Sequence, residues 1–207
     1  MKRVLLIIFV LAFSLNISCK KDKKETEVKT EETTENATIE ASESKKSVTP
    51  TDTHPGEIKK LKVSLESKSN SNVTGNVLFT EDKGVVTMIT VLGGLTEGTH
   101  AIHLHEKADC SSPDGKSSGG HWNPTAQPHG AWGDEKGHHK GDIGNLEADA
   151  NGNATKTFYT AQWCLGCGDP ERDIMGKAII VHQGADDLTS QPTGNAGGRV
   201  SCGGIIE

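Results

Sequence analysis

Apolar and polar residues alternate in short runs along the chain after its first quarter. In residues 58–67 (IKKLKVSLES) and 72–80 (NVTGNVLFT) the alternation has a period of two, the period at which the side chains of a β-strand share one face. Helical periodicity is hard to find, and Asp, Asn and Gly lie between the runs. Further apolar runs cover 85–92, 154–161, 177–182 and 199–206. Short strands separated by turn residues predict an antiparallel β-barrel or β-sandwich.

The first 18 residues follow a different pattern. Lys2 and Arg3 precede the apolar run VLLIIFVLAF and the segment SLNIS, an order typical of a secretory signal peptide and short for a membrane-spanning helix. Cys19 directly after Ser18 also fits a bacterial lipoprotein signal, although Asn16 replaces the usual leucine. We therefore expect an exported protein of the bacterial cell envelope, in the periplasm or at the outer membrane, with a membrane anchor through lipidated Cys19. The alternative is an ordinary signal peptide.

Composition divides the remaining chain into two parts. Residues 19–56 are rich in Lys, Glu, Thr and Ser and cannot bury enough apolar surface to offset chain entropy, so we expect a disordered, charged tether. Residues 57–207 are numerous enough for one domain with a hydrophobic core. The 207-residue chain carries a formal net charge of −6, and we expect no nucleic-acid partner.

Histidines are crowded in the middle of the chain. Seven of the nine lie between His100 and His139, which suggests metal binding. In AIHLH, His103 and His105 should project from one face of a strand and can share one metal. Farther along, histidines among Gly, Pro and Asn are followed by a carboxylate, which predicts a loop folded around an ion: His121, His129, His139 and Asp142. The alternative is a histidine-rich surface loop with no defined ion.

The order of several motifs gives these residues a family resemblance. The motifs H-x-H, H-x-N-P, H-G, H-x-G-D-x-G-N, V-H-x-x-x-D-D and G-N-A-G-x-R-x-x-C-G follow one another between residue 57 and the C-terminus. In this order they resemble copper/zinc superoxide dismutase. The resemblance implies an all-β fold, a flattened eight-stranded antiparallel Greek-key barrel with long metal-binding loops. It also implies copper and zinc as cofactors and superoxide as substrate.

The resemblance further implies two ligand sets that share one residue. The copper ligands are His103, His105, His121 and His182. The zinc ligands are His121, His129, His139 and Asp142. His121 belongs to both because the family's bridging ring is deprotonated and contacts both metals. We choose His139 over His138 because only His139 keeps the H-x-G-D register. The side chain of His100 should lie on the opposite face of the strand from His103, so we expect His100 to be a structural or surface histidine.

Two more residues match family positions that do not ligate a metal. Asp186 matches the carboxylate that links a copper histidine, here His103, to a zinc histidine, here His129. Arg199 matches the arginine that lies beside copper and holds the anionic substrate. Because the net charge of the chain is negative, attraction of superoxide must be local. Segment 187–194 is short and lacks the lysine and glutamates of many animal relatives.

The implied activity is the dismutation of superoxide to dioxygen and hydrogen peroxide, which would protect the cell envelope. One superoxide reduces copper and a second reoxidises it, while His121 gains and then returns a proton and zinc fixes its ring. The alternative is an exported copper- and zinc-binding or storage lipoprotein without significant catalysis, which would not need Arg199 or Asp186. A copper-only relative should lack the zinc ligands. The oligomeric state stays open, with a homodimer as one option.

Four cysteines follow Cys19. By resemblance, Cys110 and Cys202 form the family's disulfide between a metal loop and the last strand, and closing a loop of this length contributes roughly 4 kcal/mol in the chain-entropy model. Cys164 and Cys167, in WCLGCGD, have no counterpart in the family pattern. Such a pair can be a redox-active dithiol, a soft-metal site or a local disulfide. In an exported protein we expect the local disulfide.

Overall fold

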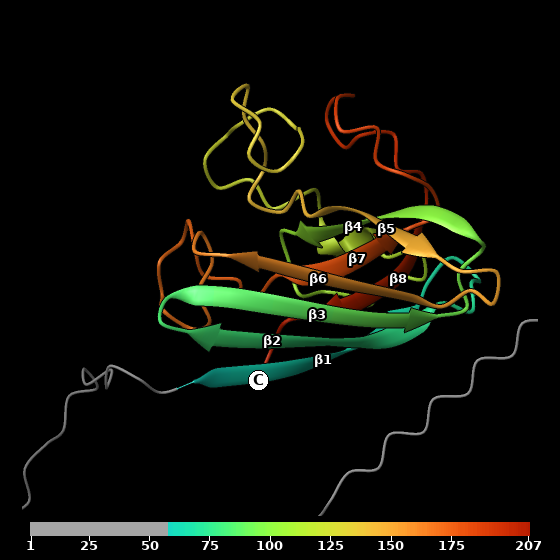
Figure 1. Cartoon of the computed structure of the whole chain (residues 1–207), viewed down its shortest axis with the longest axis horizontal. Helices are drawn as coiled ribbons and strands as arrows, with labels where there is room; N and C mark the ends of the chain where they lie inside the picture. The colour runs from blue at the N-terminus through green and yellow to red at the C-terminus, as the bar shows by residue number, and fades with distance from the viewer. Residues whose placement is uncertain (1–57) are drawn as a thin grey trace, which may run out of the picture. The chain divides into compact units, whose positions relative to one another are not determined.

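The computed structural model describes residues 58–207, which form a closed eight-stranded antiparallel barrel (Figure 1). The strands are β1 (Lys59–Ser67), β2 (Thr74–Asp82), β3 (Val85–Gly93), β4 (Gly98–His105), β5 (Gly144–Ala148), β6 (Ala154–Thr160), β7 (Ala178–His182) and β8 (Arg199–Gly204). A single 3₁₀ turn, Lys116–Ser118, follows β4 within this part of the chain. The expected signal peptide, Cys19 and the tether lie outside the described residues.

The strand order around the barrel is β1-β2-β3-β6-β5-β4-β7-β8, and β1 closes the ring by pairing with β8. The pairs β3–β6 and β4–β7 join strands that are distant in sequence, as a Greek-key arrangement requires. The predicted all-β, eight-stranded antiparallel barrel is therefore confirmed. The apolar runs did not indicate β5, because only Leu146 and Ala148 of its five residues are buried.

The alternating residues of the first strands build the core. In β1, Val63 and Leu65 are buried while their immediate neighbours face solvent. Val63 lies opposite Val77 of β2, and Phe79, two residues farther along β2, is also fully buried. Removal of this apolar surface from water stabilises the barrel, and close packing gives the loops a firm support.

Strand β4 positions the candidate site. Its last six residues are all buried, whereas a strand with one solvated face would alternate. Ile102 and Leu104 join the core, so His103 and His105 point to the opposite face. Loops 106–143 and 183–198 cover that face and hydrogen-bond both histidines. Figure 1 shows these loops, in yellow and red, rising beyond the barrel on the side of β4 and β7.

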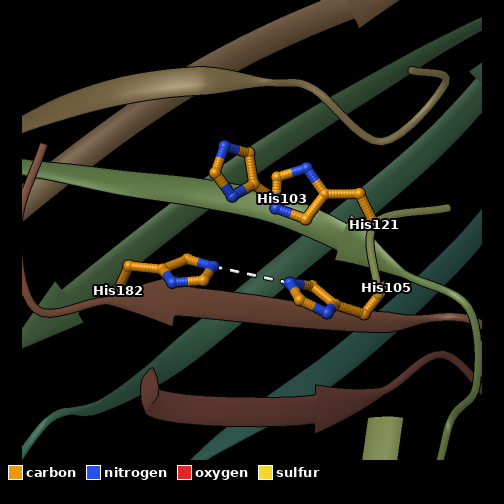
Figure 2. Close-up of side chains that lie close together, drawn as sticks. All are labelled: His103, His105, His121 and His182. Atoms are coloured by element: carbon orange, nitrogen blue, oxygen red, sulfur yellow. Dashed lines mark hydrogen bonds between the residues drawn. The ribbon is translucent and has the colours of Figure 1, made fainter. Parts of the chain in front are cut away.

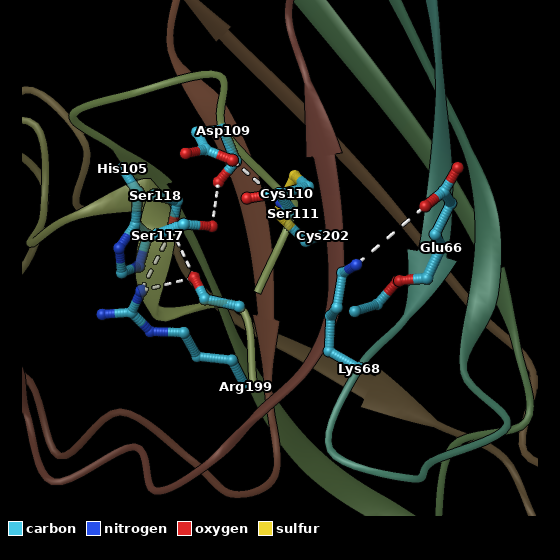
Figure 3. Close-up of a disulfide and its surroundings, with 12 residues drawn as sticks. Glu66, Lys68, His105, Asp109, Cys110, Ser111, Ser117, Ser118, Arg199 and Cys202 are labelled. Carbon is cyan, nitrogen blue, oxygen red and sulfur yellow. Dashed lines mark hydrogen bonds and ion pairs between the residues drawn. A yellow bond between two sulfur atoms is a disulfide. The ribbon is translucent and has the colours of Figure 1, made fainter. Parts of the chain in front are cut away.

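The described residues contain two disulfides, one between a loop and a strand and one within a loop. Cys110, in the loop after β4, is bonded to Cys202 of β8, 92 residues away (Figure 3). Cys164 is bonded to Cys167, three residues away, within the loop between β6 and β7. Both are the pairings that the sequence analysis expected. Among residues 58–207, the structure contains no helix long and apolar enough to cross a membrane.

Candidate metal centre

Two groups of buried potential metal ligands lie side by side at the outer face of β4. We call the first the four-histidine set: His103, His105, His121 and His182. We call the second the Asp142 set: His121, His129, His139 and Asp142. Within each set the candidate ligand atoms lie within 4.8 Å of one another. The residues expected from the sequence are thus brought together, and His121 belongs to both sets.

Three separate elements supply the four-histidine set (Figure 2). His103 and His105 come from β4, and an isolated antiparallel bridge places His121 beside His105. His182 is the last residue of β7, which pairs with β4, and a register shift at this residue pairs it with Arg199 of β8. The Nε2 atoms of His105 and His182 are 3.4 Å apart, a separation suited to two nitrogens that ligate one ion.

Buried ring nitrogens without partners mark both sets. Among the described residues, His103 Nδ1, His121 Nε2 and His129 Nδ1 are buried and accept or donate no hydrogen bond. The second nitrogen of each ring is bonded to a carboxylate. A buried polar atom left unpaired is costly, and a neutral imidazole nitrogen is a good ligand for copper and zinc. The donor chemistry therefore fits metal ions in both sets.

The geometry of the Asp142 set suits tetrahedral zinc. Asp142 Oδ1 lies 2.8 Å from His121 Nδ1, 3.1 Å from His129 Nδ1 and 3.2 Å from His139 Nδ1. Tetrahedral Zn²⁺ with nitrogen ligands at 2.0–2.1 Å places its ligand atoms about 3.3 Å apart. Asp142 Oδ2 accepts the backbone N–H of His139 at 2.7 Å and that of Gly130 at 3.2 Å, which fixes the orientation of the carboxylate.

Asp186 connects the two sets from outside. Its Oδ2 accepts a hydrogen bond from His103 Nε2 at 2.8 Å, and its Oδ1 accepts one from His129 Nε2 at 2.9 Å. These contacts leave Nδ1 of each ring free to face an ion. Asn145 of β5 holds the backbone of Asp186 through two hydrogen bonds. A Cβ at Gly194, where φ is +65°, would collide with the Asp186 carboxylate.

Gln191, in the short segment 187–194, supports the Asp142 set. Its Oε1 accepts the backbone N–H of His129 at 2.9 Å, and its Nε2 donates to the carbonyl of His129 at 2.8 Å. Neither Gln191 nor Asn145 was predicted from the sequence. Each acts on the backbone of a residue at least 41 positions away, so no local pattern reveals either one.

Individual histidines of the centre have pKa values shifted in opposite directions. In the four-histidine set, burial holds the pKa of His105 and of His182 well below the ordinary histidine value. Burial also lowers the pKa of the shared His121, to about 4. At His129 burial again favours the neutral ring, but the nearby carboxylates of Asp142 and Asp186 outweigh it and raise the pKa to about 9.

Arg199 lies half-buried beside His105 of the four-histidine set (Figure 3). Its Nη1 donates to the carbonyl of Gly115 at 2.8 Å and to Ser118 Oγ at 3.0 Å, and its Nη2 donates to the carbonyl of Gly119 at 2.7 Å. The Gly119 carbonyl also accepts a hydrogen bond from His105 Nδ1. One carbonyl therefore sets the positions of both the guanidinium and a candidate ligand.

Two histidines of the crowded region belong to neither set. His100 is buried, and its Nδ1 lies 2.9 Å from the carbonyl of His182, so it supports the end of β7. His138 stacks on Trp132 with ring centroids 4.5 Å apart. A third possible ligand group, Cys164, Cys167 and Asp173, has its two sulfurs joined in the disulfide.

Comparisons with known proteins agree with this fold and this centre. The family model for copper/zinc superoxide dismutase matches residues 73–205. The extracellular Cu-Zn superoxide dismutase of Drosophila melanogaster is 42% identical over 144 residues, which cover 66% of this chain and 77% of that protein. A solved SOD-like protein from Bacillus subtilis is 31% identical with a TM-score of 0.62, covering 70% of this chain and 97% of its own. The clock protein EA4 is 32% identical with a TM-score of 0.61, and the match covers 74% of this chain and 98% of the EA4 chain.

Fold and site together define a β-barrel protein with a paired metal centre. Its metals, as the donor chemistry and the family indicate, are copper and zinc. The chain belongs to the copper/zinc superoxide dismutase family. Its enzyme class is accordingly that of superoxide dismutase, an oxidoreductase.

Proposed function

We propose that the four-histidine set binds copper, that the Asp142 set binds zinc, and that the centre dismutates superoxide to dioxygen and hydrogen peroxide. The observation that carries this proposal is the position of the His121 ring. Its Nδ1 lies 2.8 Å from Asp142 Oδ1, and its Nε2 is buried without a partner among the described residues. One nitrogen thus belongs to each set, which supports a ring that bridges two metals.

The residues of the chain have distinct roles in this reaction. Bound copper supplies the one-electron redox chemistry, and bound zinc holds the His121 ring. His121 Nε2, buried without a partner among the described residues, would hold a proton between the two half-reactions and pass it to the reduced oxygen species. Asp186 keeps the rings of His103 and His129 in the tautomer that ligates through Nδ1.

Arg199 binds the substrate in this proposal. Its guanidinium is anchored by three hydrogen bonds to the loop after β4. Burial is the main cause of the lowered pKa of His105 and of His182, and the nearby charge of Arg199 adds to it. A fixed cation at this position attracts and orients a small anion without ligating the metal. The whole chain carries a net charge of −6, so local attraction of this kind is needed.

We infer that the enzyme acts outside the cytoplasm and protects the cell envelope from superoxide. The signal-like residues 1–18 and Cys19 support export and lipid anchoring, although they lie outside the described residues. The Drosophila relative is named as extracellular. Detergent phase partitioning of wild-type protein and of Cys19→Ser tests the anchor. Wild-type protein in the aqueous phase, with an N-terminus other than Cys19, would contradict it.

Metal analysis combined with superoxide decay tests the catalytic proposal. Protein comprising residues 20–207 should bind one copper and one zinc and accelerate the decay of superoxide in stopped-flow measurements. A fully metallated protein that leaves decay at its uncatalysed rate would instead support metal storage.

A further inference from the structure

The loop between β6 and β7 contains a disulfide that the metal centre does not use. Cys164 and Cys167 are bonded to each other, and among the described residues neither belongs to the four-histidine set or the Asp142 set. The other disulfide, Cys110–Cys202, joins β8 to the loop after β4, and a carbonyl of this loop accepts a hydrogen bond from Arg199. The local bridge therefore calls for a separate explanation.

The two sulfur atoms of the local bridge differ in their access to solvent. Cys164 is only 2% exposed, whereas Cys167 is exposed and lies between two exposed glycines, Gly166 and Gly168. A Cβ placed on either glycine would meet nothing within 4 Å, so open space surrounds Cys167. Cys202 is by contrast fully buried. An incoming thiolate can reach Cys167 far more readily than it can reach the buried sulfur of Cys202.

Hydrogen bonds that do not involve sulfur hold the loop around Cys167. Asp173 Oδ1 accepts the backbone N–H of Gly166 at 3.0 Å and that of Met175 at 3.0 Å, and its Oδ2 accepts that of Gly168 at 2.7 Å. The peptide groups on both sides of Cys167 are thus fixed by one carboxylate. The position of Cys167 does not depend on the disulfide alone.

The backbone of Cys164 is fixed in a similar way. Its N–H donates to the carbonyl of Arg172 at 2.8 Å, and its carbonyl accepts the N–H of Ile174 at 3.1 Å. Opening the bridge would therefore leave two thiols close together, ready to close again. The bridge spans three residues rather than 92, so it restricts the unfolded chain far less than Cys110–Cys202 does.

We propose that Cys164–Cys167 is a reversible thiol–disulfide exchange site for thiols outside the protein. The thiolate of an external dithiol attacks Cys167 Sγ, the Cys164–Cys167 bond breaks, and Cys164 leaves as a thiolate. The second sulfur of the dithiol then displaces Cys167. The dithiol becomes a disulfide, and its two electrons and two protons convert the cysteines to thiols. The proposed exchange site consists of residues of this loop alone and does not depend on the proposed metal chemistry.

Graded reduction of the metal-loaded protein tests the site. After titration with dithiothreitol and quenching with iodoacetamide, mass mapping should find Cys164 and Cys167 alkylated at a concentration roughly tenfold or more below that needed for Cys110 and Cys202. Removal of the reductant in air should restore the Cys164–Cys167 pair. Joint labelling of all four cysteines, or labelling of Cys110 and Cys202 first, would overturn the proposal.

Matched single variants test which sulfur is attacked. Cys164→Ser leaves the exposed Cys167 as a free thiol, which should form a mixed disulfide with oxidised glutathione. Cys167→Ser leaves the buried Cys164, which should react roughly tenfold or more slowly. Equal rates would contradict the assignment of Cys167 as the point of attack. The double variant Cys164→Ser/Cys167→Ser should keep its copper and zinc content, and loss of either metal would show that the bridge instead maintains the metal centre.

Discussion

The four-histidine set and the Asp142 set share His121, yet the chain surrounds them with opposite electrostatics. In the first set, burial lowers the pKa of His105, of His182 and of the shared His121. The second set is organised around a buried carboxylate, and the pKa of His129 is raised to about 9. The difference shows how one ring can serve two ions, since the only carboxylate among the ligands belongs to the Asp142 set.

This division has a functional consequence for each ion. In the proposed copper site, four imidazoles with an adjacent cation, Arg199, suit an ion that changes its oxidation state while an anion approaches. A site with a carboxylate and three imidazoles provides the closed tetrahedral coordination of structural zinc. Substitutions in the two sets should therefore affect the two metals differently.

Asp142→Asn should remove zinc while leaving copper in place. The variant loses the anion around which His121, His129 and His139 are grouped, so we expect zinc affinity to fall more than about 100-fold, beyond the loss typical of supporting residues. Chelator competition followed by elemental analysis measures both metals. Retention of zinc at wild-type affinity would mean that Asp142 is not a ligand.

Asp186→Asn should weaken both halves together. The amide cannot accept hydrogen bonds from both His103 and His129 as the carboxylate does, and losing such a supporting carboxylate typically costs about 10–100-fold in metal affinity or activity. Asp187→Asn is the matched control, since Asp187 is exposed and contacts neither histidine. Similar losses in the two variants would contradict the role of Asp186 in supporting His103 and His129.

Arg199→Ala should lower the rate constant for superoxide by about tenfold or more at low salt, the scale expected for local electrostatic attraction. Its copper content should stay unchanged because Arg199 does not ligate. Added salt should reduce the difference from wild type. Copper loss, or an unchanged rate at low salt, would exclude this role.

Acidification should release zinc before copper. In the metal-free protein His129, with a pKa raised to about 9, is protonated throughout the neutral range, so zinc must displace its proton. Each unit of pH decrease then weakens zinc binding about tenfold for that proton. His105 and His182, with lowered pKa values, stay neutral until the pH is well below 6.5. Dialysis at stepped pH with metal analysis checks the order of release. Loss of copper before zinc would contradict this prediction.

Gln191→Ala should have the smallest effect, a roughly threefold to tenfold faster loss of zinc with copper unaffected, near the lower limit for supporting residues. The variant loses both hydrogen bonds to the backbone of His129. Gln191→Glu keeps the acceptor and loses the donor, so it should fall between Ala and wild type. Equal zinc release from all three proteins would show that this contact does not position His129.

Local patterns predicted the barrel and part of the candidate site, whereas the complete ligand sets, with His182, followed only from the family resemblance. Alternation predicted most strands, and AIHLH placed His103 and His105 on one face. Strand β5 was missed because it is five residues long with two buried side chains. Asn145 and Gln191 were missed because their roles depend on contacts to backbone atoms that the fold brings together from distant positions.

Anomalous diffraction at the copper and zinc absorption edges tests the shared role of His121 most directly. Crystals of the metal-loaded protein should show a copper peak beside His121 Nε2, among His103, His105 and His182. They should also show a zinc peak about 2.0–2.1 Å from His121 Nδ1, beside Asp142. Two peaks on the same side of the ring, a single peak, or metals that do not contact His121 would contradict the bridged centre.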